Sequence, residues 1–191
     1  MSGGHRYRRA SKATTLATLA AKKAANEPIV MVTAYDHPSA RIADEVGVDL
    51  VLVGDSAANV VLGYESTVPV TVAEMLVLTG AVRRGLESAL LVADLPFGSY
   101  EASDEQAVRT AQRFVKEGGA DAIKLERGGT SVARARAVIQ AGIPVMGHVG
   151  LTPQAVNVLG GYNARARTEA EAAKIIGDAR SLCDAGAFAI V

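Results

Sequence analysis

Short apolar runs alternate with longer segments of helical periodicity from residue 28 to the end of the chain. The apolar runs are continuous over four or five residues, as strands buried on both faces are, and lie at residues 29–33, 50–53, 89–93, 122–125, 144–147 and 187–191. Helices are predicted between them, at residues 37–46, 72–86, 104–116, 131–140 and 169–183. Strand and helix in alternation predict a parallel sheet joined by right-handed crossovers.

Glycines mark the passage from helix to strand. Gly47, Gly119, Gly142 and Gly186 each follow a predicted helix and precede a predicted strand within a few residues. Glycine readily takes the left-handed conformation that ends a helix. The four positions therefore indicate one structural unit that is used repeatedly along the chain.

Six predicted strands are compatible with two α/β architectures. A closed (β/α)8 barrel of the TIM type needs eight parallel strands, whereas an open doubly wound sheet can stop at six. The segment "TAYDHPSA" after the first strand lacks the glycine-rich phosphate turn typical of a doubly wound dinucleotide-binding sheet. We therefore expect a TIM-type barrel that is truncated after about six strands, because the last apolar run reaches Val191.

Composition and charge exclude several classes of function. The 191 residues are 49% hydrophobic and 21% charged, which is ordinary for one soluble domain. Twenty basic residues balance twenty acidic ones, aromatic residues make up 4% and tryptophan is absent, so neither a nucleic-acid surface nor a membrane surface is indicated. No apolar run has the length of a membrane span. The single cysteine allows no internal disulfide and fits a reducing compartment.

The first 26 residues contain no acidic residue but six basic ones. This composition is compatible with an organellar transit peptide. The alternative is a disordered basic arm at residues 1–10, followed by an N-terminal capping helix at residues 11–27 with Ser11 as its N-cap. We favour the alternative because no cleavage-like boundary separates the helix from the barrel domain of residues 28–191.

Polar residues follow the predicted strands at the points where the strands end. Asp55 and Ser56 follow the second strand, Asp94 the third, Glu126 the fourth and His148 the fifth. In parallel α/β folds the catalytic groups gather at the carboxyl ends of the strands. Several polar residues in corresponding positions therefore predict an active site at this edge.

Asp55 and Asp94 close neighbouring strands, and two converging carboxylates repel each other unless a cation lies between them. Oxygen ligands favour magnesium over zinc. The alternative is that each aspartate caps the loop or helix that follows it. Together with Glu126, the metal interpretation is preferred.

Lys124 and Glu126 are two residues apart on one predicted strand, so both side chains point toward the barrel interior. Charged groups cannot remain unpaired there. Either they form a structural ion pair, or Lys124 meets a substrate oxyanion while Glu126 completes the oxygen shell of the metal. His148, at the same rim, is either structural or a hydrogen-bonding partner of a substrate oxygen.

Three long segments should also lie on this rim, at residues 57–70, 97–103 and 151–168. Loops of this length in a compact fold usually cover or form a binding site. The third contains Gly160 and Gly161, which is also compatible with a disordered or interface loop.

The chain resembles the ketopantoate hydroxymethyltransferase family almost without interruption from Pro28 to Val191. The motifs that carry the resemblance are "PIVMVTAYDHPSARIADEVGVDLVLVGDSAANVVLGYESTVPVT", "VADLPFGSY", "AIKLE", "GIPVMGHVGLTPQ", "VLGGY" and "DAGAFAIV". The segment "KATTLATLAAKK" is similar to the N-terminal helix of the family.

The resemblance implies a (β/α)8 barrel of the phosphoenolpyruvate/pyruvate superfamily. It also implies transfer of a hydroxymethyl group from 5,10-methylenetetrahydrofolate to 3-methyl-2-oxobutanoate, giving 2-dehydropantoate in pantothenate biosynthesis through a magnesium-stabilised enolate. The family's residues fall on this sequence as follows: magnesium ligands on Asp55, Asp94 and Glu126, ketoacid contacts on Asp55, Ser56, Asp94 and Lys124, and catalytic groups on Lys124 and His148. A cytoplasmic homo-oligomer, often a decamer, is implied as well.

The sequence departs from the family at two places. Arg127 stands where the family runs from glutamate into two glycines, and it either weakens the metal role of Glu126 or binds the acidic tail of the folate. The family's general-base glutamate is expected at the second residue after Val191, so the 191 residues alone are expected to have little turnover.

Two other functions are weighed against the transferase. A truncated, non-catalytic protein would still bind ketoacid and metal. A 2-oxo-acid lyase or mutase of the same superfamily would usually carry a cysteine loop near the site. Cys183 instead falls within a predicted helix, where it is expected to pack.

Overall fold

The computed structural model describes residues 13–191, so the predicted arm at residues 1–10 and the predicted cap Ser11 lie outside the described residues. Six strands form one sheet in the order of the sequence: β1 (Met31–Thr33), β2 (Leu50–Val53), β3 (Leu90–Asp94), β4 (Ala122–Glu126), β5 (Val145–His148) and β6 (Ala189–Ile190). All neighbouring strands are parallel. The six predicted strands are therefore confirmed, each to within two residues.

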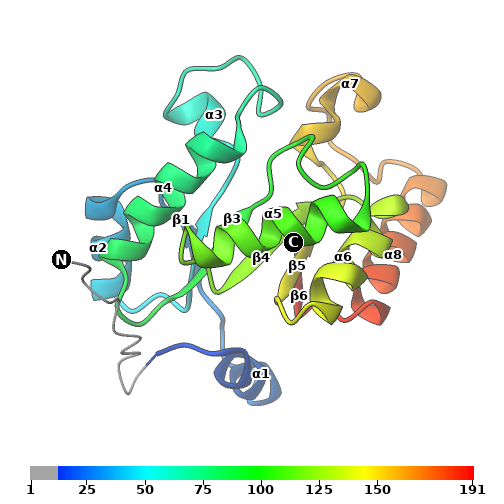
Figure 1. Cartoon of the computed structure of the whole chain (residues 1–191). Coiled ribbons are helices and arrows are strands. Elements are labelled where there is room, and N and C mark those ends of the chain that lie inside the picture. The colour runs from blue at the N-terminus through cyan, green and yellow to red at the C-terminus, as the bar shows by residue number, and fades with distance from the viewer. Residues whose placement is uncertain (1–12) are drawn as a thin grey trace.

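The five predicted helices are also confirmed, and they lie in a row along one face of the sheet (Figure 1). They are α2 (His37–Glu45), α4 (Val72–Gly85), α5 (Asp104–Lys116), α6 (Thr130–Gln140) and α8 (Glu169–Asp184). A doubly wound sheet reverses its strand order and carries helices on both faces. The observed order and the single helical layer are those of a (β/α) barrel wall, so the doubly wound alternative is wrong.

Each face of the sheet has its own core. Val51, Leu91 and Ile123 face the helices. Leu90 and Val92 face the other way, toward the inside of the curl, together with Met31, Leu50, Leu52, Ala122, Met146, Phe188 and Ala189. Because side chains alternate along a strand, the polar residues two and four positions after these apolar ones also point inward. This alternation brings Asp94, Lys124, Glu126 and His148 to the inner face, whereas Asp55 lies in the loop after β2.

Helix α1 (Leu16–Ala24) contributes Leu19 to the inner core, next to the first residues of the strands. Thr15 is its N-cap and accepts a hydrogen bond from the Thr18 backbone N–H at 3.1 Å, while the Thr15 N–H donates to Thr18 Oγ1 at 2.8 Å. The reciprocal pair of threonines forms a capping box at the start of the described helix, and the predicted cap Ser11 lies outside the described residues.

Two of the segments predicted as loops contain short helices. Helix α3 (Ala57–Val60) lies in one, and the 3-10 helix η1 (Pro153–Ala155) with α7 (Val156–Leu159) lies in the other. Figure 1 shows α3 and α7 projecting beyond the same end of the sheet. Elements of three or four residues are too short for periodicity to reveal them.

Two further expectations concern the single cysteine and the membrane-spanning length of helices. Cys183 is exposed on α8, so the prediction that it packs in the interior is wrong. No helix within residues 13–191 has the length and hydropathy needed to cross a membrane.

Candidate active site

The predicted site residues lie together at the carboxyl edge of the sheet, and the strand register sets which of them are neighbours. Asp94, the last residue of β3, pairs in register with Lys124 in β4. Glu126, the last residue of β4, pairs with His148 at the end of β5. Asp55 follows β2 and lies beside Asp94. The structure thus brings every predicted site residue to one edge.

Lys124 and Asp94 form a buried ion pair, with Lys124 Nζ 2.6 Å from Asp94 Oδ1. Burial by itself lowers the pKa of Lys124, but the negative charges of Asp94, Glu126 and Asp55 outweigh burial and raise it. The side chain is therefore held as an ammonium ion. An ion pair between Lys124 and Glu126, one of the two sequence-based alternatives, is wrong, because the register places Asp94 opposite Lys124.

Asp55 and Asp94 are in direct contact. The Asp55 backbone N–H donates to Asp94 Oδ2 at 3.0 Å. Burial, and then the charge of Asp94, raise the pKa of Asp55 to about 7. Neither carboxylate caps a helix, since the N-cap of α3 is Ser56 and makes no side-chain capping bond. The capping alternative is therefore wrong, and two carboxylates are held side by side.

Glu126 has both carboxylate oxygens occupied. Its Oε1 is hydrogen-bonded to His148 Nδ1 at 3.0 Å, and its Oε2 accepts the Gln154 backbone N–H at 3.1 Å. Within residues 13–191, no three side chains of His, Cys, Asp or Glu gather closely enough to hold a metal ion together. Both oxygens of Asp94 are engaged in the same way, Oδ1 by Lys124 Nζ and Oδ2 by the Asp55 backbone N–H. A metal contact from Asp94 or from Glu126 would therefore have to share an oxygen with these partners.

Gln154 and Tyr100 also belong to the site and were not predicted from the sequence. Gln154 Nε2 donates to Asp55 Oδ2 and to the Leu95 carbonyl, each at 2.9 Å. Tyr100 donates its hydroxyl to Gln154 Oε1 at 2.6 Å, and burial raises the pKa of that hydroxyl, which keeps it protonated. Both residues lie in rim segments that have no helical or strand periodicity. The one signal that marks them in the sequence is their place within the motifs "LPFGSY" and "LTPQ".

Ser56 has a partner from the first strand end. Its Oγ and the Tyr35 hydroxyl are hydrogen-bonded at 2.7 Å, and both residues are half-buried. A Cβ on the preceding Gly54 would lie 2.8 Å from Ser56 Oγ, so glycine is needed for this close approach. The Ser56 hydroxyl is thereby held beside the carboxylate pair.

The balance of charge at the site fits a divalent cation. Three buried carboxylates, those of Asp55, Asp94 and Glu126, surround the single ammonium group of Lys124. Mg²⁺ is commonly held by one or two carboxylates, with its other positions filled by water and substrate oxygens. Asp55 and Asp94, whose carboxylates are close enough for the charge of Asp94 to raise the pKa of Asp55, match that requirement.

Arg127 lines a hollow of about 390 Å³ beside the site. Its backbone has a positive φ of 73°, and its N–H donates to the His148 carbonyl at 2.8 Å. Arg165 and Lys174 line the same hollow but pair with Glu171 and Asp178, at 3.4 and 2.7 Å. No acidic side chain within residues 13–191 forms an ion pair with Arg127.

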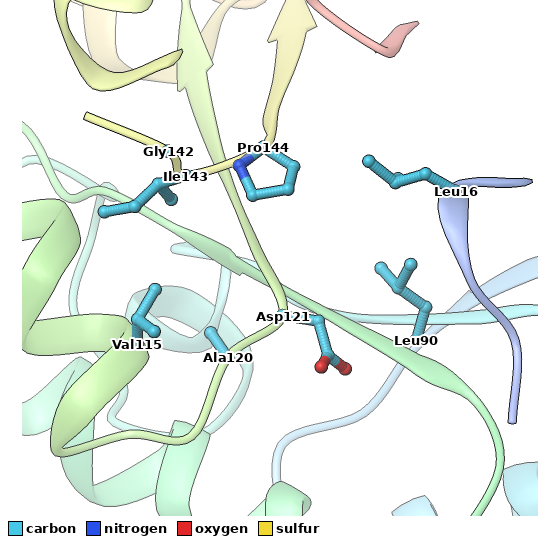
Figure 2. A pocket seen from close by; sticks show the side chains of 8 residues that line it. All are labelled: Leu16, Leu90, Val115, Ala120, Asp121, Gly142, Ile143 and Pro144. Carbon is cyan, nitrogen blue, oxygen red and sulfur yellow. The ribbon is translucent and has the colours of Figure 1, made fainter. Parts of the chain in front are cut away.

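A second hollow, of about 370 Å³, lies at the opposite ends of the strands (Figure 2). Leu16 of α1, Leu90 at the start of β3 and residues that precede β4 and β5 line it. Asp121 is the charged residue of this lining, and it accepts the Leu91 N–H at 3.0 Å. This hollow contains none of the predicted site residues.

Comparison with known proteins places this geometry in a family. The family model described as ketopantoate hydroxymethyltransferase matches residues 13–191. The 3-methyl-2-oxobutanoate hydroxymethyltransferase of Thermobifida fusca is 54% identical over 182 residues, covering 95% of this chain and 65% of that protein. The Moorella thermoacetica enzyme of the same name is 56% identical over 177 residues, covering 93% and 66%. The mitochondrial 3-methyl-2-oxobutanoate hydroxymethyltransferase 1 of Arabidopsis thaliana is 51% identical over 190 residues, covering 99% and 55%.

Solved structures with low sequence identity share the fold. A 2,3-dimethylmalate lyase, described as a member of the PEP mutase/isocitrate lyase superfamily, superposes with a TM-score of 0.63 at 20% identity, covering 90% of this chain and 60% of that one. A phosphonopyruvate hydrolase in complex with oxalate and Mg²⁺ superposes with a TM-score of 0.68 at 14% identity, covering 92% and 61%. This chain spans 55% to 66% of the length of the three hydroxymethyltransferases above. By its match over residues 13–191, the chain belongs to the ketopantoate hydroxymethyltransferase family.

Proposed function

We propose that this protein takes part in hydroxymethyl transfer from 5,10-methylenetetrahydrofolate to 3-methyl-2-oxobutanoate, giving 2-dehydropantoate. The observation that carries the proposal is the contact of Asp94 with both Lys124 Nζ and the Asp55 backbone N–H. Around this contact lie the buried ammonium ion of Lys124 and the buried carboxylates of Asp94 and Asp55, whose charges both raise the pKa of Lys124. Such a site suits a reaction in which negative charge develops on a substrate oxygen.

Sequence similarity favours this reaction over lyase or mutase chemistry. Relatives with 51% to 56% identity carry the hydroxymethyltransferase name, whereas the lyase and the hydrolase share 14% to 20%. Sequence identity of 14% to 20%, as with the lyase and the hydrolase, supports a shared fold alone. The cysteine that the lyase alternative would need at the rim is also not supplied by Cys183, which is exposed on α8.

Asp55 and Asp94 would hold Mg²⁺ at the carboxyl edge. Bound there, the ion would supply Lewis-acid polarisation of the keto group of the 2-oxo acid.

Lys124 would stabilise the reacting oxygen. Its ammonium ion lies inside the curl of the sheet, where water is largely excluded and a positive charge acts strongly on a developing oxyanion. Asp94 fixes this ammonium ion in place through the ion pair. Ser56, held by Tyr35, is proposed to donate a hydrogen bond to the ketoacid.

His148 would bind a substrate oxygen through its second ring nitrogen. Glu126 takes up Nδ1, so the orientation of the ring is set and Nε2 remains for another partner. The proton on C3 of the ketoacid needs a base, which the family resemblance places two residues after Val191. The Val149 N–H donates to the Val191 carbonyl at 2.9 Å, so the end of β6 runs beside the strand that carries His148.

Arg127 and the hollow that it lines are proposed to receive the acidic tail of the folate. The other two cations of this hollow, Arg165 and Lys174, pair with acidic side chains, whereas Arg127 has no acidic partner in residues 13–191.

Assembly into homo-oligomers and a cytoplasmic location remain proposals from the family. Among the relatives, the Arabidopsis protein is named mitochondrial.

The proposal is tested by incubating the protein with 3-methyl-2-oxobutanoate, 5,10-methylenetetrahydrofolate and Mg²⁺, and by measuring 2-dehydropantoate by mass spectrometry. Product that forms with Mg²⁺ and disappears with EDTA supports the transfer. The Thermobifida fusca enzyme, run in parallel, is the positive control. Magnesium-dependent ketoacid binding without any product would favour the non-catalytic alternative, and cleavage of a carbon–carbon bond would favour the lyase.

A further inference from the structure

Gln154 connects the two acidic parts of the site. Its backbone N–H donates to Glu126 Oε2 at 3.1 Å, and its side-chain amide donates to Asp55 Oδ2 at 2.9 Å. We propose that Gln154 is a positioning residue whose amide, oriented by Tyr100, fixes the Asp55 carboxylate so that it can bind a divalent cation. This inference rests on the metal site of the proposed function.

The hydrogen-bond directions leave one orientation for the amide. The Tyr100 hydroxyl accepts the Glu126 N–H at 3.2 Å, so its own hydrogen goes to Gln154 Oε1 at 2.6 Å. Gln154 Nε2 then directs its two hydrogens to Asp55 Oδ2 and to the Leu95 carbonyl, each at 2.9 Å. The reversed amide would set its oxygen against two acceptor oxygens, so Tyr100 determines the direction of the amide.

Burial keeps this arrangement in a single state. Gln154 is 4% exposed and Tyr100 is fully buried. Leaving a buried polar group without its hydrogen-bond partner costs about 1–3 kcal/mol of free energy. Rotation of the Gln154 or Tyr100 side chain away from its hydrogen bonds is therefore disfavoured.

The two oxygens of Asp55 thereby have different roles. Oδ2 accepts the Gln154 amide, whereas no side chain or backbone N–H within residues 13–191 donates to Oδ1. Oδ1 therefore remains for a ligand. A partner that holds the non-ligating atom of a metal-binding side chain typically changes metal affinity 10- to 100-fold.

The hydrogen bond from the Gln154 amide to Asp55 also connects the site to a segment at the rim of the sheet. Gln154 lies in η1, directly before α7, the helix that projects beyond the sheet (Figure 1). Thr152 and Ala155, on either side of it, are buried. Docking of this segment is thus what places the amide on Asp55.

The inference is tested by titrating the metal-free protein with Mn²⁺ and measuring free Mn²⁺ by electron paramagnetic resonance. Gln154→Met keeps the length of the side chain and removes its donors, and we expect Mn²⁺ binding to weaken about 10- to 100-fold. Tyr100→Phe should weaken binding by a smaller factor. Because Tyr100 acts on Asp55 through Gln154, the double variant should lose less than the product of the two single losses.

A matched control is Gln106→Met. The Gln106 side chain also makes two hydrogen bonds, donating to the Gly98 carbonyl at 2.9 Å and accepting the Ala102 N–H at 3.0 Å, but it does not contact the carboxylates. This variant should leave Mn²⁺ affinity unchanged. If Gln154→Met does not fold, Tyr100→Phe against the same control decides the question.

Unchanged Mn²⁺ affinity in Gln154→Met, an equal loss in Gln106→Met, losses that multiply in the double variant, or no Mn²⁺ binding by the unaltered protein would each overturn the inference. The assay uses neither ketoacid nor folate. A protein that binds Mn²⁺ as expected but makes no 2-dehydropantoate therefore refutes the proposed function and leaves the role of Gln154 standing.

Discussion

Lys124 lies directly opposite Asp94 in the parallel register of β4 and β3, and Lys124 Nζ is 2.6 Å from Asp94 Oδ1. Both side chains are buried, at 4% and 2% exposure, so this pair differs from a surface salt bridge. Removing Asp94 would take away the nearest of the negative charges that face Lys124, and removing Lys124 would leave Asp94 buried without its counter-charge. The pair is therefore a sensitive place to test both the fold and the chemistry.

Asp94→Asn should lower magnesium-dependent activity by about 100-fold or more, because a metal's stabilisation of transition-state charge is worth several kcal/mol. The free energy of unfolding should fall by about 3 kcal/mol while the protein stays folded, since Lys124 loses its counter-charge. Steady-state kinetics and urea unfolding measure the two effects. Combining Asp94→Asn with Lys124→Met should restore part of the stability, and undiminished activity in Asp94→Asn would refute the metal assignment.

The pKa of Asp55 predicts how the stability of the metal-free protein depends on pH. Burial and the charge of Asp94 raise this pKa from 3.8 to about 7, so the folded state holds the proton more tightly than the unfolded state. The contribution of this group to stability is complete below about pH 4 and is lost as the pH rises to about 7, with an upper limit of about 4 kcal/mol.

Urea unfolding in EDTA at pH 5, 6, 7 and 8 measures that loss. Asp55→Asn should flatten the pH dependence, because the substituted side chain does not titrate. Added Mg²⁺ should restore stability at pH 8, where the carboxylate that it binds is ionised. A metal-free protein whose stability rises over this range would contradict the assignment.

Two glycines of α4 should respond to alanine in opposite directions. A Cβ on Gly85 would lie 2.6 Å from the His37 carbonyl oxygen and 2.9 Å from Ala40 Cβ, so Gly85→Ala should lower the free energy of unfolding by about 1–3 kcal/mol. At Gly80 the nearest atom would be Arg84 Nη1 at 3.5 Å, so Gly80→Ala should raise it by about 0.5–1 kcal/mol. Thermal or urea unfolding of both variants checks the packing of α2 on α4, and equal effects would show that this packing is wrong.

Arg127→Ala should raise the KM for 5,10-methylenetetrahydrofolate several-fold and leave the KM for the ketoacid unchanged, because a charged contact to a carboxylate contributes about 1.5 kcal/mol or more. The effect should grow when the folate carries additional glutamates. Arg41→Ala is the control, since Arg41 forms an exposed pair with Glu45 on α2. Equal changes in both KM values would place Arg127 at the ketoacid instead.

The strands and main helices could be predicted from the sequence because the physical cause is local. A strand such as Leu50–Val53 shows its burial as an unbroken apolar run, and α5 shows its caps and its apolar stripe within its own residues. The glycines that end the helices also act locally, as the positive φ values of Gly47 and Gly186 confirm. The edge of the sheet that carries the site follows from the same pattern, because polar residues come directly after the buried runs.

Only the tertiary structure decided which of these residues touch. Lys124 pairs with Asp94 rather than with Glu126, and Glu126 pairs with His148, because the offset between parallel strands sets these contacts. Gln154 reaches Asp55, 99 positions away in the sequence, through an irregular rim segment. Neither the offset between strands nor the path of such a segment leaves a periodic trace in the chain. The charged residues at the strand ends could therefore be inferred from the sequence, whereas Gln154, Tyr100 and the contacts within the site could not.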